Sequence, residues 1–189
     1  RTLVIIAVPD DEIASVDQSL AKHQSQLDLI GAAHTSGALP GSELKRLSAA
    51  EVPVGSLHPL QTFPRQGLSP SLKGVYFAVE GEAILQPILF RLVKKLGGVP
   101  IELPTEGKSL YHTAAVFASH FLPVLLREAR ELLIAAEIPY DKVRPMLAPL
   151  MRASLENCLQ KGEVEALTGP IARGDAATIR RHLEVLQEI

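Results

Sequence analysis

Hydrophobic residues gather in the first hundred or so positions in five short runs, which alternate with segments of helical periodicity. Continuous apolar runs of four to eight residues bounded by turn residues are typical of buried strands. We therefore expect strands at residues 3–8, 29–33, 52–57, 75–79 and 99–103. Strands that alternate with helices predict an α/β unit with a mostly parallel sheet, in which ligands bind outside the carboxyl ends of the strands.

Helices are expected between these strands. The first would follow residue 9, because Asp10 can accept hydrogen bonds from free backbone N–H groups and acids are favourable in a first turn. A short helix is expected over residues 41–50. The strongest helical pattern covers residues 81–96, with Lys94 and Lys95 in the last turn and a glycine pair as its stop.

After residue 104 the pattern becomes helical to the end. We expect helices over residues 108–136, 140–161 and 175–189, with Asp175 capping the last one. Pro123 predicts a kink or break near residues 119–122. The change in pattern places a domain boundary near residues 104–107, so residues 1–105 would carry the sheet and residues 106–189 would form a helical domain.

The helix that begins at Lys108 has two distinct faces. At 3.6 residues per turn, one face is apolar and is expected to meet the core: Leu110, Ala114, Phe117 and Phe121. The other face is more polar, and we expect it to meet a ligand cleft: Lys108, Tyr111, His112, Ala115 and Ser119.

Composition narrows the class of protein. The chain is 47% hydrophobic, which is ordinary for a globular protein with a real core, and its formal charge of -2 favours neither nucleic acid nor an anionic membrane as a partner. A single cysteine suits a reducing compartment, so a cytoplasmic location is expected. The first apolar run ends at Pro9, too early for a signal peptide or a membrane span. Because the chain starts with Arg1 directly on a strand, we expect it to be a fragment.

Polar residues follow three of the expected strands and would meet at one edge of the sheet. They are Pro9-Asp10, Thr35-Ser36-Gly37 and His58-Pro59. Taken singly, each is more often a turn, a helix cap or a hydrogen-bonded loop histidine than a ligand site. Together they suggest a ligand site, since glycine admits a ligand to the backbone, a hydroxyl can hold a ligand oxygen, and histidine titrates near neutral pH.

Lys108 and His112 lie one helical turn apart and would point into the same cleft. A lysine beside a carbonyl or hydroxyl carbon can pass a proton or stabilise developing negative charge. Its pKa falls where it is desolvated. The alternative is a solvated lysine in the first turn with a histidine that caps or packs.

Seven segments together resemble a known family: LVIIAVPDDEI, HTSGAL, HPLQTF, FAVEG, LGGVPIEL, KSLYHTAAVFASHF and LTGPIARGD. They are similar to two-domain Rossmann-like proteins whose second domain is related to that of 6-phosphogluconate and β-hydroxyacid dehydrogenases. The branch that matches carries a C-terminal domain of unknown function. The resemblance implies a partial Rossmann-like nucleotide-binding domain over residues 1–105, followed by an all-helical domain over residues 106–189.

The resemblance also implies a nicotinamide cofactor, with NADP slightly preferred over NAD, and a small-molecule substrate. Residues that would border the nicotinamide are Ala7, Val8, Pro9, Thr35 and Gly37. Residues that would act on or orient the substrate are Lys108 as general acid/base, His112, Ser36 and His58. Relatives that act on hydroxyacids have asparagine where His112 stands, which puts the substrate class in doubt, and relatives commonly form homodimers through the helical domain.

The glycine-rich fingerprint G-x-G-x-x-G occurs nowhere in the chain and would be expected about 60 residues before Arg1. The resemblance implies an NAD(P)-dependent oxidoreductase acting on a hydroxy acid, keto acid or imine. A binding protein that keeps the fold without turnover is the alternative. A metal-dependent hydrolase using His34, His58 and His112 is a third, weaker one, because no second histidine or carboxylate stands at ligand spacing and no metal is expected.

Overall fold

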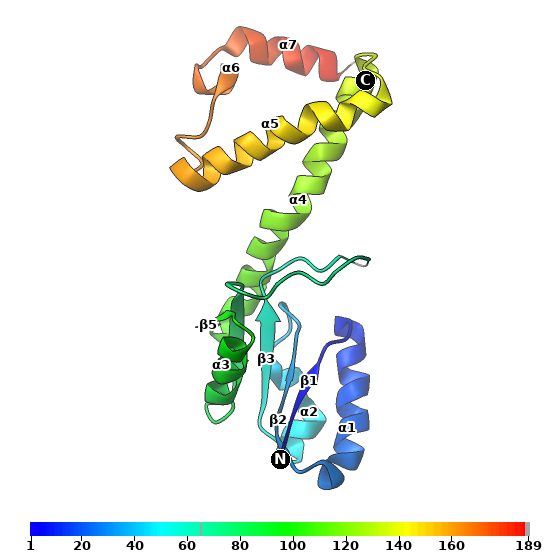
Figure 1. Cartoon of the computed structure of the whole chain (residues 1–189), viewed down its shortest axis with the longest axis vertical. Coiled ribbons are helices and arrows are strands. Elements are labelled where there is room, and N and C mark those ends of the chain that lie inside the picture. Colours follow the sequence, from blue (N-terminus) through cyan, green and yellow to red (C-terminus); the bar gives the residue numbers. More distant parts are fainter. Residues whose placement is uncertain (65, 188–189) are drawn as a thin grey trace. The chain divides into compact units, whose positions relative to one another are not determined.

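The computed structural model describes residues 1–64 and 66–187. The chain divides into two compact units, Arg1–Ser119 and His120–Ile189, which we call the sheet unit and the helical unit (Figure 1). The last strand ends at Glu102 and only helices and turns follow it, as the sequence predicts. The contact boundary lies beyond the change in pattern, so the first turns of the long helix belong with the sheet unit.

The sheet unit contains five strands in sequence order: β1 (Thr2–Ile6), β2 (Leu29–His34), β3 (Val54–Pro59), β4 (Tyr76–Gly81) and β5 (Val99–Glu102). All pairs are parallel except β3 with β4, which is antiparallel. The five expected strands and the α/β fold class are therefore confirmed. β1 pairs only with β2 in the described part of the chain, so its outer edge is open.

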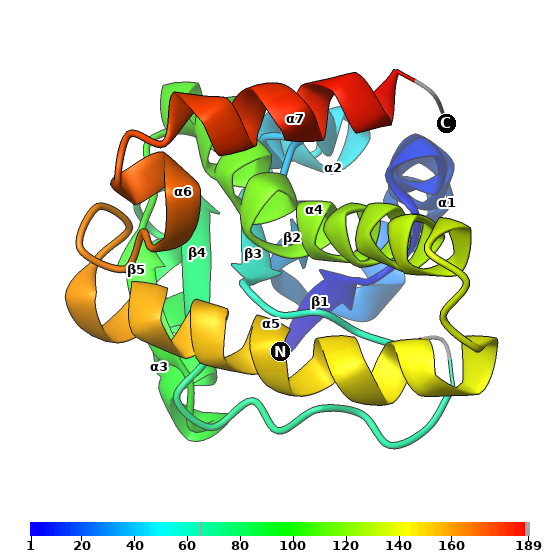
Figure 2. The same cartoon turned by 90° about the horizontal axis from the view of Figure 1, so that it is seen from above.

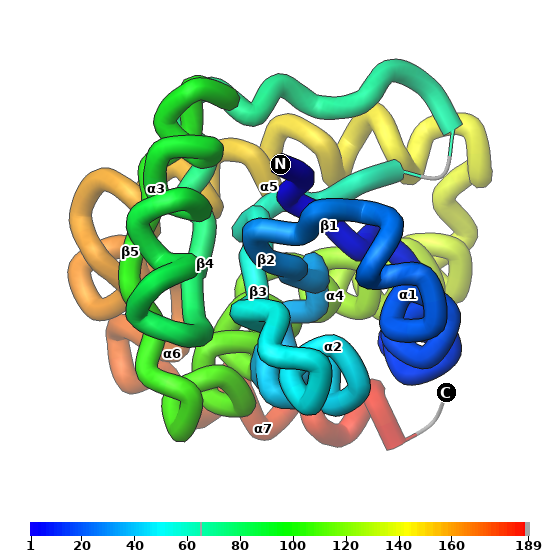
Figure 3. Tube along the Cα trace, turned by 90° about the horizontal axis from the view of Figure 1, so that it is seen from below, coloured from blue at the N-terminus to red at the C-terminus, as the bar shows by residue number. Residues whose placement is uncertain are grey.

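Two helical layers cover the sheet. α1 (Ile13–Leu27) contacts β1, β2 and α2 (Lys45–Ala49), whereas α3 (Gln86–Lys95) contacts β4 and β5 (Figure 3). Neighbouring residues of one strand serve opposite layers: Ala32 belongs to the cluster under α1 and α2, and Ala33 to the cluster under α3. This alternation is the two-residue period of a strand that is buried on both faces.

Two details differ from the sequence prediction. α3 begins at Gln86 rather than near residue 81, because Gly81 is the last residue of β4 with φ of +139°. A side chain there would collide with Gly55 on β3. Asp10 does not cap α1: it lies in the 3-10 turn η1 (Asp10–Glu12), and its carboxylate accepts a hydrogen bond from Ser36 instead.

The remaining helices are α4 (Lys108–Ala135), α5 (Tyr140–Lys161), α6 (Gly169–Ala172) and α7 (Ala176–Leu186). α4 is preceded by a 3-10 turn, η3 (Thr105–Gly107). The predicted starts at residues 108 and 140 are confirmed, and the break expected near Pro123 is absent, because α4 runs through it. α6, a short helix between α5 and α7 (Figure 2), was not expected.

Asp175 caps α7 as predicted: its Oδ1 accepts from the Thr178 amide at 3.0 Å. The predicted extension of this helix to residue 189 reaches past the described residues.

The expectation that the apolar stripe of α4 meets the core is wrong. Leu110 is 77% exposed, Phe117 63% and Phe121 43%, so the apolar stripe does not lie in the core of the chain. Lys108, by contrast, is 1% exposed. The polar start of α4 therefore packs inward.

α4 is also notable for its hydropathy. By length and composition alone, Thr105–Ala135 could cross a membrane, with a mean hydropathy of 1.3 and none of its apolar window buried. One such helix is weak grounds for a membrane protein, and exposed apolar helices equally suit an interface with another protein chain.

Candidate functional site

The carboxyl ends of β1, β2 and β3 meet at one edge of the sheet, as the sequence predicts. The parallel register pairs Ile6 with His34 and His34 with Ser56. Val54, Ser56 and His58 are two residues apart and therefore share one face of β3. At Val54 this face packs in the same cluster as Ile13 of α1 and Leu47 of α2. At the polar end of that face, the first turns of α4 contact β3 through Lys108 and Tyr111.

Lys108 is enclosed at this edge. Its Nζ donates to Ser56 Oγ at 2.7 Å and to the Ser36 carbonyl oxygen at 3.3 Å. Burial lowers the pKa of Lys108, while the negative charges of Glu80 and Asp10 oppose that shift. An ammonium held in this way is a fixed positive charge close to the strand ends.

Ser56 and Glu80 were not singled out from the sequence, yet they form the inner part of the site. Ser56 is fully buried and Glu80 is 5% exposed. Ser56 Oγ donates to Glu80 Oε2 at 3.0 Å, and the Gly41 amide donates to the same oxygen at 2.7 Å. Thr105, in η3, donates to Glu80 Oε1 at 2.8 Å. Strand, loop and turn thus converge on one carboxylate.

Ser36 organises the loop after β2. Its hydroxyl donates to Asp10 Oδ2 at 2.9 Å and accepts from the amides of Ala38 and Leu39 at 3.2 and 3.0 Å. Its carbonyl oxygen receives Lys108. In this arrangement the predicted substrate-orienting hydroxyl of Ser36 already has three partners, and its visible role is to shape the loop.

His34 has a structural role. Its Nε2 lies 2.9 Å from the Pro40 carbonyl oxygen, and its Nδ1 accepts from the Ser36 amide at 3.2 Å. This pattern assigns the proton to Nε2 and leaves the ring neutral. Burial is the main cause of the lowered pKa of His34. In the described part of the chain, no group of three or more His, Cys, Asp or Glu residues is placed to hold a metal ion.

Two imidazoles close over Gly37. A Cβ atom added to Gly37 would lie 2.8 Å from His58 Nε2 and 2.7 Å from His112 Cδ2. The two rings lie edge to face, with centroids 6.1 Å apart. Gly37 is therefore glycine because of close approach, and the structure brings the predicted residues Gly37, His58 and His112 together.

Tyr111 completes this cluster and was not among the predicted site residues. Its hydroxyl lies 2.9 Å from His58 Nδ1, and the two rings meet edge to face. Burial raises the pKa of Tyr111 to about 12. Burial, followed by the positive charges of His112 and Lys108, lowers the pKa of His58 to about 4. At neutral pH the pair is a neutral imidazole beside a protonated phenol.

The residues predicted to border a nicotinamide follow β1 and β2. Thr35 is held to the end of β1, since its amide donates to the Ile6 carbonyl oxygen at 3.0 Å. Ala7 and Pro9 are exposed, while Val8 packs against the cluster under α1 and α2. Three acids follow at once in η1. Because carboxylates repel phosphate, these strand ends do not favour a phosphate group.

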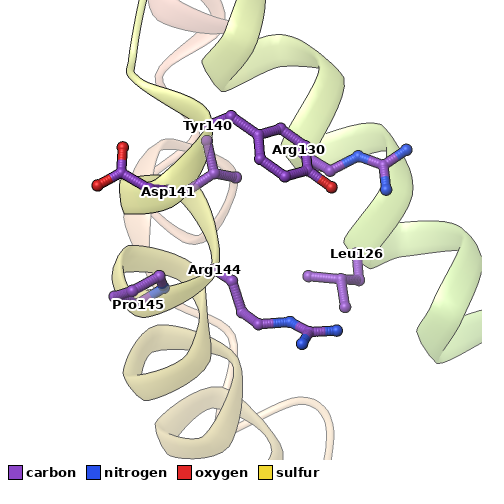
Figure 4. A pocket seen from close by; sticks show the side chains of 7 residues that line it. Leu126, Arg130, Tyr140, Asp141, Arg144 and Pro145 are labelled. Atoms are coloured by element: carbon purple, nitrogen blue, oxygen red, sulfur yellow. The ribbon is translucent and has the colours of Figure 1, made fainter.

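A separate pocket lies within the helical unit between α4 and α5 (Figure 4) and has a volume of about 450 Å³. It is lined by Leu126, Arg130, Tyr140, Asp141, Val143, Arg144 and Pro145. The Arg130 guanidinium is already paired with Glu131 at 2.6 Å. None of the predicted site residues lines this pocket, so we do not assign the chemistry to it.

Comparisons with known proteins agree with this fold. A family profile described as a domain of unknown function, DUF2520, matches residues 75–189, which is more than half of the chain. No curated protein sequence matches significantly.

Solved structures with the same fold include protein TM1727 from Thermotoga maritima, at 25% identity and a TM-score of 0.81 over 100% of this chain and 71% of that one. BF3122 from Bacteroides fragilis, provisionally described as an NADP oxidoreductase, has 24% identity and a TM-score of 0.76 over 98% and 68%. Pyrroline carboxylate reductase from Plasmodium falciparum, solved with NADP bound, has 11% identity and a TM-score of 0.65 over 95% and 72%. At identities as low as those of the last two, likeness shows the fold alone.

Proposed function

This chain belongs to the DUF2520 family, and from that premise we propose that it is part of an NAD(P)-dependent oxidoreductase acting on a small metabolite. The observation that carries the proposal is the cluster at the carboxyl ends of β1 to β3. There a buried ammonium, two imidazoles and a phenol converge beside the ends of the parallel strands. Likeness of fold to structures described as NADP oxidoreductases supports it.

The cofactor would supply or accept a hydride at the substrate carbon. Ala7, Val8, Pro9, Thr35 and Gly37 are the residues that would border its nicotinamide. The glycine-rich pyrophosphate turn does not occur within these 189 residues. We propose that NADP is slightly preferred over NAD, as the resemblance implies.

Lys108 has one of two roles that its chemistry allows. Because its ammonium is enclosed and already donates to Ser56 and Ser36, its burial favours stabilising negative charge that develops on a substrate oxygen. Direct general acid/base action would need substrate to reach Nζ. Hydride transfer to a carbonyl creates such an oxygen charge, so a fixed cation nearby lowers the barrier.

Proton transfer is better suited to the half-buried imidazoles. His58 is neutral at physiological pH and can accept a proton from a substrate hydroxyl, with Tyr111 holding its ring through Nδ1. His112 stands beside it and can orient the substrate. These residues are proposed to serve a hydroxy acid, keto acid or imine.

Turnover tests this proposal. The natural full-length protein should oxidise NADPH or NADH with at least one member of a panel of keto acids and imines, or reduce NADP or NAD with a hydroxy acid. His58→Gln should reduce kcat by about 100-fold or more, as expected for the loss of a proton carrier. If the protein binds nicotinamide nucleotides with the same affinity in the wild type and in His58→Gln, but turns over no compound in the panel, the result would instead support the binding protein.

We also propose that the chain forms a homodimer through the helical unit. In this unit the described helices bury only two hydrophobic side chains, Val143 and Leu147. Leu125, Leu150 and Leu159 are more than half exposed. A unit with so little core needs a partner surface to be stable, and a second copy presents the same apolar helices.

A cytoplasmic location stays a prediction.

A further inference from the structure

The buried ammonium of Lys108 has no carboxylate within ion-pair distance in the described part of the chain. Its two bonded acceptors, Ser56 Oγ and the Ser36 carbonyl oxygen, are both uncharged. A buried cation with only neutral acceptors loses its proton readily, because desolvation disfavours the charged form. Something further must compensate the charge if Lys108 is to remain a cation.

The hydrogen bonds of Ser56 are directional. A hydroxyl has one proton to donate, and Ser56 gives it to Glu80 Oε2 at 3.0 Å. Its lone pairs then face Lys108, whose Nζ donates at 2.7 Å. The three groups therefore form one chain in which each proton points toward Glu80, and the hydroxyl transmits the pull of the carboxylate to the ammonium.

Glu80 is fixed as the acceptor at the end of this chain. The Gly41 amide can only donate, and it donates to the same oxygen as Ser56. Thr105 donates to the other oxygen. Three donors around one buried carboxyl group hold it in one orientation.

We propose that Glu80 is the counter-ion of Lys108, acting through the hydroxyl of Ser56, and so is a positioning residue for the site. It keeps Lys108 protonated at working pH although the two side chains do not touch. A catalytic role for the pairing of Glu80 with Lys108 rests on the proposed oxidoreductase function, whereas the electrostatic coupling of the two charges does not.

Other charged and titratable groups also act on Lys108. Asp10, in η1, opposes the lowering of its pKa, as Glu80 does. Four titratable side chains belong to the elements around it: His34 on β2, His58 on β3, and Tyr111 and His112 on α4 itself. Glu80 differs from all of them because a continuous hydrogen-bonded chain joins it to the ammonium.

The test is to titrate Lys108 by NMR in the full chain labelled at lysine Nζ and Cε, with its resonance assigned by loss in Lys108→Arg. Glu80→Gln should lower the titration midpoint of Lys108 by about one pH unit or more, because one buried negative charge is removed. Ser56→Ala should also lower it, since the bridge is gone. Glu82→Gln is the matched control: Glu82 lies two residues away and also accepts a backbone amide, from Val54.

An unchanged midpoint in folded Glu80→Gln, or an equal shift in Glu82→Gln, would overturn the proposal. If Glu80→Gln does not fold, Ser56→Ala decides, and an unchanged midpoint there would equally overturn it. No cofactor or substrate is used, so failure here leaves the oxidoreductase proposal standing, and failure of nicotinamide binding leaves this coupling standing.

Discussion

The hydroxyl of Tyr111 lies 2.9 Å from Nδ1 of His58 and joins the first turns of α4 to the end of β3. This bond leaves Nε2 of His58 directed at Gly37, and the ring of His112 lies close to the same glycine. The phenol therefore sets which imidazole nitrogen faces the candidate substrate position.

Tyr111→Phe should destabilise the chain by about 1–3 kcal/mol, because a half-buried ring nitrogen loses its partner. Chemical denaturation measures this change, and ¹⁵N NMR of the histidine rings should show a changed tautomer balance at His58. Tyr76→Phe, on β4 and 52% exposed, is the control and should have little effect. Equal effects of the two substitutions would contradict the pairing.

The lowered pKa of His58 predicts acid sensitivity. Its pKa is about 4 in the folded chain and near 6.5 when unfolded, so the unfolded state binds a proton first as pH falls. The stability that the neutral imidazole of His58 contributes is fully present above pH 6.5 and is lost as pH falls through about 4. Melting temperatures between these values should fall less steeply in His58→Gln than in the wild type. Parallel curves would mean that His58 is not held neutral by the fold.

Gly37→Ala should disturb the two imidazoles directly. The new methyl group would lie within 3 Å of both rings, and we expect a loss of about 1–3 kcal/mol from overpacking. Gly107→Ala is the matched control, since the nearest atom to its methyl group would be 3.4 Å away. Denaturation midpoints of both variants measure the difference. A Gly37→Ala variant as stable as the control would show that the rings do not close on this residue.

The exposed helices predict association. Sedimentation should give twice the chain mass of 20.4 kDa. Leu159→Glu, at a residue 74% exposed on α5, should shift the protein toward monomer by placing a charge in an apolar interface. Ser154→Glu, at an exposed polar position of the same helix, should not. A wild-type chain that sediments as a stable monomer would contradict the homodimer.

Much of the fold could be predicted from the sequence because its strands appear as continuous apolar runs, and the central strands β2, β3 and β4 are largely buried on both faces. The parallel ends of β1 to β3 follow from that alternation, and so does the convergence of Ser36, His58 and Lys108. Glu80 was missed because it stands at the end of such a run, in FAVEG, where a strand normally turns. A carboxylate there needs a buried partner, but Ser56 becomes that partner only through the antiparallel pairing of β3 with β4.

The faces of α4 could not be assigned by hydropathy alone. An apolar stripe predicts burial, but not against which surface, and here the polar start of the helix meets the sheet. Lys108 is buried because Ser56 and the Ser36 carbonyl oxygen accept its protons, which no helical periodicity reveals. For the same reason, Lys108→Ala is expected to destabilise the fold by about 3–5 kcal/mol by leaving Glu80 uncompensated.

Binding of a reduced nicotinamide tests the central claim most directly. The natural full-length protein should be titrated with NADPH and NADH, following nicotinamide fluorescence, in parallel with the 189-residue chain. We expect micromolar binding by the full-length protein, tighter for NADPH, and weaker binding by the chain alone, in which the glycine-rich turn does not occur. No binding of either nucleotide by either form would contradict the oxidoreductase account and leave a fold used for recognition.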